Sequence, residues 1–245
     1  MLAAASFLAE PVTEAAPATD LPKLPDVFPT QPEELVRETV TVAHGNFKRL
    51  RELVDARPSL AKASYDWGFG DWEDALGAAS HVGNHEIAEY LIAEGARPTL
   101  YSAAMMGQLD VVKAFVAAQP GCQRIPGPHS ISLLAHAANG KSEAVRKYLE
   151  SLGDAGTPPA APVTEAELAA LTGTYSFGDS ALDKIDVTLV KGSLMFQRKG
   201  RIARGLVHDG GLVFHPAGSS AVRIRFASNS LSVHDPELVL AGKKS

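Results

Sequence analysis

The stretch from Gly83 to Ile92, GNHEIAEYLI, decides what kind of fold this chain can form. It consists of a glycine and an amphipathic segment, with apolar residues five, eight and nine positions after the glycine. Those positions share one face of an α-helix, so the stretch predicts a turn followed by a helix with one buried side. The same pattern returns after Gly45 and Gly107, and more loosely after Gly140. Its recurrence predicts a stack of similar helical units.

A second, shorter helix is expected before each of the last three glycines. In each case a leucine stands seven positions earlier and is followed by small residues; the three are Leu76, Leu100 and Leu133. A small-residue helix, a glycine turn and a larger helix, stacked on their neighbours, resemble the ankyrin repeat over residues 33–152. The Thr-Pro-Leu-His signature of that family is absent. The resemblance implies a scaffold that binds a protein partner and carries out no chemistry.

The spacing of the glycines differs along the chain. The 24-residue step from Gly83 to Gly107 is too short for a projecting hairpin, so we expect only a turn at 95–98. The 38-residue step from Gly45 to Gly83 has extra length and contains the loop 65–72, YDWGFGDW. This loop holds both tryptophans of the chain.

Large aromatic side chains are typical of binding hot spots, so the loop is the first candidate for a binding surface. Tyr101 and His129 are expected behind it. In the competing interpretation the tryptophans fold back and cover the exposed end of a short stack. The candidate binding residues are Trp67, Phe69, Asp71, Trp72, Tyr101 and His129.

Motifs for catalysis, metals and cofactors are missing from the sequence. There is no His-Glu-x-x-His spacing, no nucleophile elbow and no phosphate-binding loop. We expect His44, His81 and His136 to be turn histidines that bond to the backbone, and Asp71, Glu73 and Asp74 to act as charges at a helix N-terminus. The sequence therefore predicts a protein that is not an enzyme and has neither cofactor nor metal.

The sequence changes character after residue 152. Residues 153–163 have the composition of a linker, and Thr164 with Glu167 fits a capping box that opens a short helix. From Gly173 onward, short alternating segments separated by glycines predict an antiparallel β-meander, curled into a sheet or a small barrel, within 164–245. Together with the helical repeats this gives an α+β fold. The segment around Leu171, Gly173 and Tyr175 resembles the start of small lipocalin-like β-domains of bacterial exported proteins.

The inward side chains of this β-domain should either fill a core or line a cavity for a small apolar ligand. The expected inward residues are Phe177, Leu189, Phe196, Val207, Phe214 and Phe226.

Charge and composition limit the partners. The net charge of −5 is the sum of −9 over residues 1–170 (13 Lys+Arg, 22 Asp+Glu) and +4 over residues 171–245 (10 and 6). The two parts could therefore attract each other across a shared face. Basic and aromatic residues are not interleaved in the second part, so no nucleic-acid partner is expected.

The single cysteine, Cys122, rules out an intrachain disulfide, and no apolar run is long enough for a membrane span.

The first 32 residues do not look like part of a folded domain. The apolar run 1–9 and the small residues at 16–18 resemble the end of a bacterial export signal, which would make the protein periplasmic or secreted. The alternative is a disordered leader on a cytoplasmic protein.

Taken together, the features of the whole sequence indicate a protein–protein interaction module built on ankyrin repeats. The alternative is a small-ligand-binding or enzyme-accessory protein that uses its β-domain.

Overall fold

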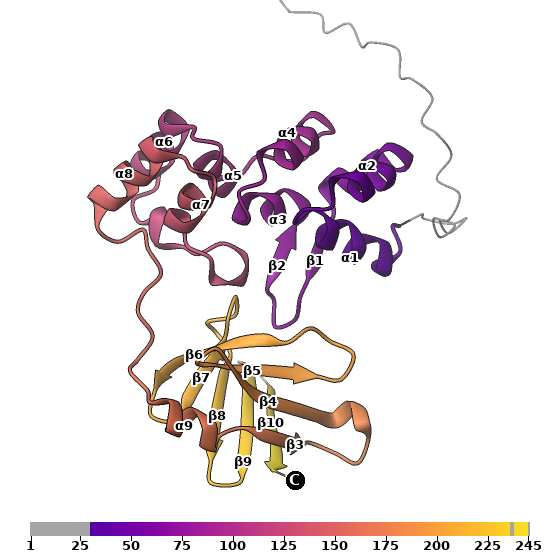
Figure 1. Ribbon diagram of the computed structural model, residues 1–245, viewed down its shortest axis with the longest axis vertical. Helices are drawn as coiled ribbons and strands as arrows, with labels where there is room; N and C mark the ends of the chain where they lie inside the picture. Colours follow the sequence, from indigo (N-terminus) through magenta and orange to yellow (C-terminus); the bar gives the residue numbers. More distant parts are fainter. Residues whose placement is uncertain (1–29, 236–237, 245) are drawn as a thin grey trace, which may run out of the picture.

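The computed structural model describes residues 30–235 and 238–244, so the expected leader lies outside the described residues. The fold is α+β: the first part is helical, and the C-terminal part is a closed antiparallel β-barrel (Figure 1). Within the described residues, no helix is long and apolar enough to cross a membrane.

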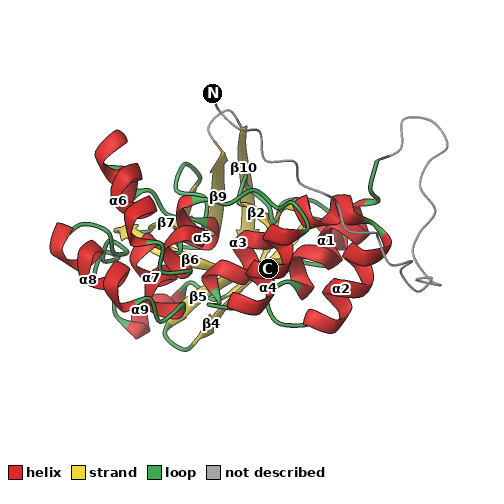
Figure 2. Ribbon diagram, turned by 90° about the horizontal axis from the view of Figure 1, so that it is seen from above, coloured by secondary structure: helices red, strands yellow, loops and turns green. Residues whose placement is uncertain are grey.

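The helical part consists of consecutive pairs of helices. Seen from above, they follow one another in a row from α1 and α2 at one end to α7 and α8 at the other (Figure 2). Each pair is joined across one of the repeated glycines. The helices are α1 (Glu33–Val42), α2 (Phe47–Ala56), α3 (Ala75–His81), α4 (His85–Ala93), α5 (Leu100–Met105), α6 (Leu109–Ala118), α7 (Leu133–Asn139) and α8 (Glu143–Leu152).

Local sequence explains where these helices begin and which face they bury. The side chains of Asn46 and Asn84 cap α2 and α4 by accepting hydrogen bonds from backbone N–H groups in the first turn. Leu91 and Val112, on the apolar faces of α4 and α6, are completely buried, as their helical register predicts. The short helices α3, α5 and α7 contact one another in series, because their small residues allow close approach.

The long step between the first two glycines forms a β-hairpin. After the short helix η1 (Pro58–Lys62), strand β1 (Ser64–Asp66) pairs antiparallel with β2 (Trp72–Asp74). The hairpin extends from the helical part toward the barrel (Figure 1). Residues 94–99, between α4 and α5, contain no strand, in agreement with the expected short turn.

The C-terminal part opens with α9 (Glu165–Ala170), whose capping box between Thr164 and Glu167 confirms the predicted helix start. Eight strands then form a meander that closes when β10 pairs with β3. They are β3 (Gly173–Ser176), β4 (Lys184–Val190), β5 (Ser193–Arg198), β6 (Arg204–Gly210), β7 (Val213–Pro216), β8 (Arg223–Ala227), β9 (Ser230–Asp235) and β10 (Leu238–Lys244).

One expected inward residue of the barrel is wrong. Phe196, Phe214 and Phe226 are buried in the core as predicted, and Phe177 and Leu189 are partly buried against it. On β6, however, the buried positions are Arg204, Leu206 and His208, so Val207 lies on the other face. Val207 is one position away from the buried series, which includes the charged side chain of Arg204.

The helical part and the barrel touch directly. The ring of Phe69 at the hairpin tip lies 6.1 Å from that of Phe196 on β5. Asp71 of the hairpin pairs with Arg204 of β6 at 2.5 Å, and the Gly218 N–H donates to Oγ of Ser130 at 2.7 Å. The attraction anticipated from the opposite charges of the two parts thus includes a specific buried ion pair.

Candidate functional site

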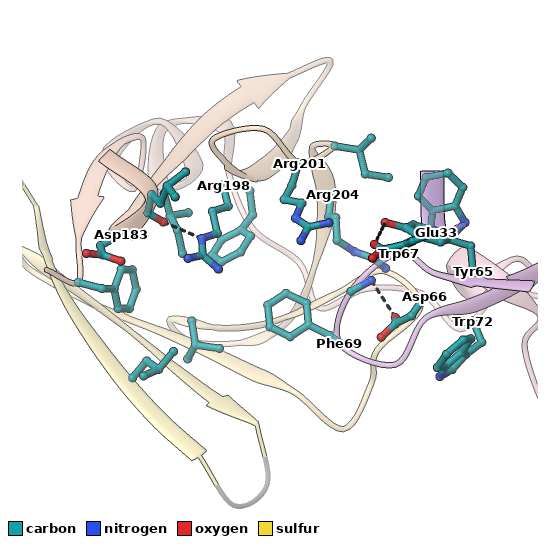
Figure 3. Close-up of a pocket in the computed structure, with 18 of the residues that line it drawn as sticks. Glu33, Tyr65, Asp66, Trp67, Phe69, Trp72, Asp183, Arg198, Arg201 and Arg204 are labelled. Carbon is teal, nitrogen blue, oxygen red and sulfur yellow. Dashed lines mark hydrogen bonds between the residues drawn. The ribbon is translucent and has the colours of Figure 1, made fainter. Parts of the chain in front are cut away.

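A pocket of about 820 Å³ lies where the hairpin meets the mouth of the barrel (Figure 3). Its wall is mainly apolar and comes from both parts of the chain. The hairpin contributes Tyr65, Trp67, Phe69 and Trp72, and the barrel contributes Phe177, Ile185, Phe196, Val233 and Leu240. The pocket does not have to fit inside the small barrel, because the hairpin forms an additional wall outside the barrel.

The tip of the hairpin is shaped by three consecutive residues in left-handed backbone conformations. Gly68, Phe69 and Gly70 have φ values of 110°, 60° and 76°, and the Gly68 N–H donates to Oδ1 of Asp66 at 2.8 Å. Glycine adopts such angles without steric cost, whereas a phenylalanine does so only when its surroundings hold it there. Here the tight turn directs the Phe69 ring toward the barrel (Figure 3).

Three arginines lie along one side of the pocket: Arg198, Arg201 and Arg204 (Figure 3). Arg198 donates from Nε to the Leu182 carbonyl oxygen at 2.6 Å, and Arg201 is exposed. Arg204 is only 8% exposed, and its Nη2 donates to Asp71 and to the carbonyl oxygen of Ala217. Its Nε and Nη1 are buried and have no hydrogen-bond partner among residues 30–235 and 238–244. A buried guanidinium with two unused donors is suited to receive an anion.

Two buried carboxylates lie behind the aromatic wall. Asp71 accepts hydrogen bonds from the backbone N–H of His129 at 2.9 Å and from its Nδ1 at 2.7 Å. Glu73 accepts from Nε1 of Trp67 at 2.7 Å. Nitrogen atoms of three histidines also surround Glu73: Nδ1 of His81 at 3.1 Å, Nε2 of His129 at 3.3 Å and Nε2 of His44 at 3.7 Å.

The contacts in this cluster shift the pKa values of its members. Burial by itself would lower the pKa of His129, but hydrogen bonds to Asp71 and Glu73 outweigh burial and raise the pKa to about 9. Burial by itself would raise the pKa of Glu73, but the contacts with His129, His81 and His44 outweigh burial and lower it to about 2. The pKa of Asp71 is also lowered, because its bonds to His129 and Arg204 outweigh its burial. At neutral pH both carboxylates are therefore charged.

Two expectations for these polar residues need correction. His44 and His136 do bond to backbone carbonyl oxygens as turn histidines should, but His81 faces Glu73 instead. Asp74 caps α3 as expected, accepting from the Gly77 N–H, whereas Asp71 and Glu73 are buried in the histidine cluster and cap no helix. The partners of Asp71 include His129 and Arg204, which are far from it along the chain, so no local pattern in the sequence predicts these pairs.

The six candidate residues do not form one site. Trp67, Phe69 and Trp72 line the pocket, and Asp71 and His129 lie behind its wall. Tyr101 lies elsewhere: its ring packs on His136 at 5.0 Å and its hydroxyl donates to the Ile125 carbonyl oxygen. Arg204, Glu73 and His81 were missed as site residues. The alternation along β6 could have identified Arg204, because Arg204 and Leu206 are two positions apart and therefore lie on the same buried face of the strand.

Comparison with models of known protein families gives no match, and comparison with curated protein sequences gives none either. A function for this chain must therefore be inferred from the pocket and its charged groups.

Proposed function

We propose that this protein binds a small amphiphilic anion, with an apolar body and a carboxylate or similar group at one end, in the pocket between hairpin and barrel. The observation that carries this proposal is the buried Arg204, which lines a pocket of aromatic and aliphatic side chains and whose Nε and Nη1 have no hydrogen-bond partner among the described residues. Burying such donors without a partner is costly, and an anionic ligand would remove that cost. The proposed role is binding rather than catalysis.

The size and composition of the pocket agree with such a ligand. Pockets that bind small molecules typically enclose about 300–1,000 Å³ and combine apolar walls with a few polar groups. Here the apolar groups come from the hairpin and the barrel mouth, and the positive charges lie along one side (Figure 3). An anionic end would lie against the arginines while the hydrocarbon covers the aromatic rings. An uncharged or cationic ligand would leave the arginine donors unpaired.

In this proposal the helical part is an ankyrin-type stack that holds the hairpin in place. The stack supports the hairpin through Tyr65 and Trp67, whose rings contact each other at 4.9 Å, and Tyr65 belongs to the core of the first helices. The barrel serves as the lipocalin-like half of the site. The tip of the hairpin meets the barrel of its own chain through Phe69 and Asp71.

The binding proposal is tested by titration followed through intrinsic fluorescence. Trp67 and Trp72 are the only tryptophans and both line the pocket, so ligand binding should change their emission. We expect dodecanoate, below its micelle concentration, to bind saturably and at least about tenfold more tightly than 1-dodecanol, a difference of about 1.4 kcal/mol. Dodecyltrimethylammonium, which has the same tail and the opposite charge, should bind more weakly still.

Two residues on β10 provide a matched pair of variants. Leu240 lines the pocket and Leu238 does not, yet both side chains are about half exposed and should tolerate substitution. Leu240→Glu should abolish dodecanoate binding and Leu238→Glu should leave it unchanged. Equal affinities for dodecanoate and dodecanol, or equal behaviour of the two variants, would contradict the proposal.

A second candidate function is the binding of a protein partner, favoured by Trp72, whose side chain is 61% exposed at the rim of the pocket. Exposed tryptophans are frequent anchors of interfaces. If this function holds, Trp72→Ala should weaken the affinity for a partner captured from the native source by more than about 1 kcal/mol. The melting temperature should not change, and Phe115→Ala, at an exposed aromatic on α6, is the control. Loss of stability without loss of affinity would exclude this role for Trp72.

A further inference from the structure

The buried cluster around Glu73 holds more negative than positive permanent charge. Asp71 and Glu73 are 2% and 1% exposed, and Arg204 is the permanently charged cation that bonds to one of them. With neutral histidines the three groups carry a net charge of −1. Buried charge is costly unless it is compensated, so the cluster favours one further positive charge.

The ring nitrogens of two histidines are oriented in the way that metal-binding histidines are. Nδ1 of His129 donates to Asp71, which leaves Nε2 facing Glu73 at 3.3 Å. Nδ1 of His44 lies 3.1 Å from the carbonyl oxygens of Val40 and Thr41, and its Nε2 faces the same carboxylate. Carbonyl oxygens only accept, so this Nδ1 carries the hydrogen and Nε2 of His44 carries the lone pair. A carboxylate or carbonyl on the far nitrogen is the usual support of a metal-bound histidine.

Two buried atoms at the centre of the cluster have no hydrogen-bond partner in the part of the chain that the structure describes. They are Oε1 of Glu73 and Nδ1 of His81, which lie 3.1 Å apart without forming a hydrogen bond to each other. Both side chains are more than nine-tenths buried. Buried polar atoms without a hydrogen-bond partner are rare in folded proteins, and a bound ion would compensate for the hydrogen bonds that these atoms lack.

We propose that His44, Glu73 and His129 bind a divalent transition-metal ion of the Zn²⁺ class. Imidazole nitrogens with a carboxylate oxygen suit this class of metal. The donor atoms of these three residues lie within 4.8 Å of one another. Two ligands at about 2.1 Å from one tetrahedral metal are about 3.4 Å apart, so the longest separation must shorten by about 1.4 Å when the ion binds. The rings of His44 and His129 are partly exposed, and their rotation toward the ion would close this distance.

The position of these residues indicates a structural rather than a catalytic metal. The three ligands come from the turn after α1, from β2 and from η3 (Pro128–Ser130). A metal there would join the hairpin to the first helix pair and to the loop before α7. Through Asp71 it would also hold Arg204 of the barrel. Metal binding would stabilise the folded state because the unfolded chain has no assembled site.

Metal binding is tested with untagged protein that has been treated with a chelator and dialysed. We expect calorimetry to show one Zn²⁺ per chain and thermal unfolding to show a higher melting temperature with Zn²⁺. Co²⁺ should give the visible absorption bands of a tetrahedral site. His44→Gln should lower Zn²⁺ affinity at least about tenfold and Glu73→Gln should do the same. His44 is partly exposed, so its variant keeps the fold even if Glu73→Gln does not.

The control variant is His215→Gln in the barrel. His215 also pairs with a carboxylate, through Nδ1 at 2.8 Å from Asp209, but no second histidine belongs to that pair. Its substitution should leave Zn²⁺ affinity and the Co²⁺ spectrum unchanged. Absence of Zn²⁺ binding, or loss of binding in His215→Gln with retention in His44→Gln, would overturn the proposal. These outcomes are independent of dodecanoate binding, which is measured at another site.

Discussion

Replacing Gly83 by alanine should destabilise the helical part by about 3–5 kcal/mol, because strain and collision add together. Gly83 has a φ of 74°, in the left-handed region that alanine avoids. A Cβ atom there would lie 2.1 Å from the backbone oxygen of Asn139, which cannot move without displacing the end of α7. Urea denaturation followed by far-UV circular dichroism measures the change in the free energy of unfolding.

Gly45 is the matched control, because it occupies the same position of the repeated pattern. A Cβ at Gly45 would meet no atom within 4 Å, and its φ is not in the left-handed region. We expect Gly45→Ala to change the free energy of unfolding by less than about 1 kcal/mol. Gly140→Ala should behave like Gly83→Ala, since its Cβ would lie 2.1 Å from the Met105 oxygen. Similar effects at Gly45 and Gly83 would contradict the described packing of the stack.

Replacing Arg204 by methionine should weaken the attachment of the barrel to the helical part by about 3–5 kcal/mol, the usual cost of removing one partner of a buried ion pair. Asp71, at 2% exposure, would keep its bonds to His129 but lose the guanidinium, and Ala217 would lose a donor to its carbonyl oxygen. The expected result is separation of the two parts with each part still folded.

The separation is measured after cutting the linker. A protease site placed at the exposed residues 157–160 allows the chain to be cleaved without disturbing Ala161, whose N–H donates to the His208 carbonyl oxygen. The wild-type fragments should elute together in size-exclusion chromatography, and the Arg204→Met fragments should elute apart. Arg225→Met, at an exposed position of β8, is the control. Co-elution of the Arg204→Met fragments would show that other contacts hold the two parts together.

The sequence by itself determined the local structure of this protein. The spacing of apolar residues after each glycine placed the larger helices and identified Leu91 and Val112 as buried, and alternation with glycine turns predicted the antiparallel strands. The capping box at Thr164 was correct to the residue. These features depend on periodicity within about ten residues, so they can be predicted without knowledge of the rest of the chain. The assignment of the helical stack to the ankyrin type stays a prediction.

Only the tertiary structure decided the site. Three left-handed residues at 68–70 direct Phe69 into the barrel mouth, and Arg204, 133 residues from Asp71 along the chain, becomes the buried partner of that carboxylate. The histidines around Glu73 come from three different turns. No local pattern marks such residues, because their proximity depends on how the hairpin leaves the stack and how the barrel docks against it. Charge asymmetry could indicate that the two parts attract, but the pairing of individual side chains is set by their three-dimensional arrangement.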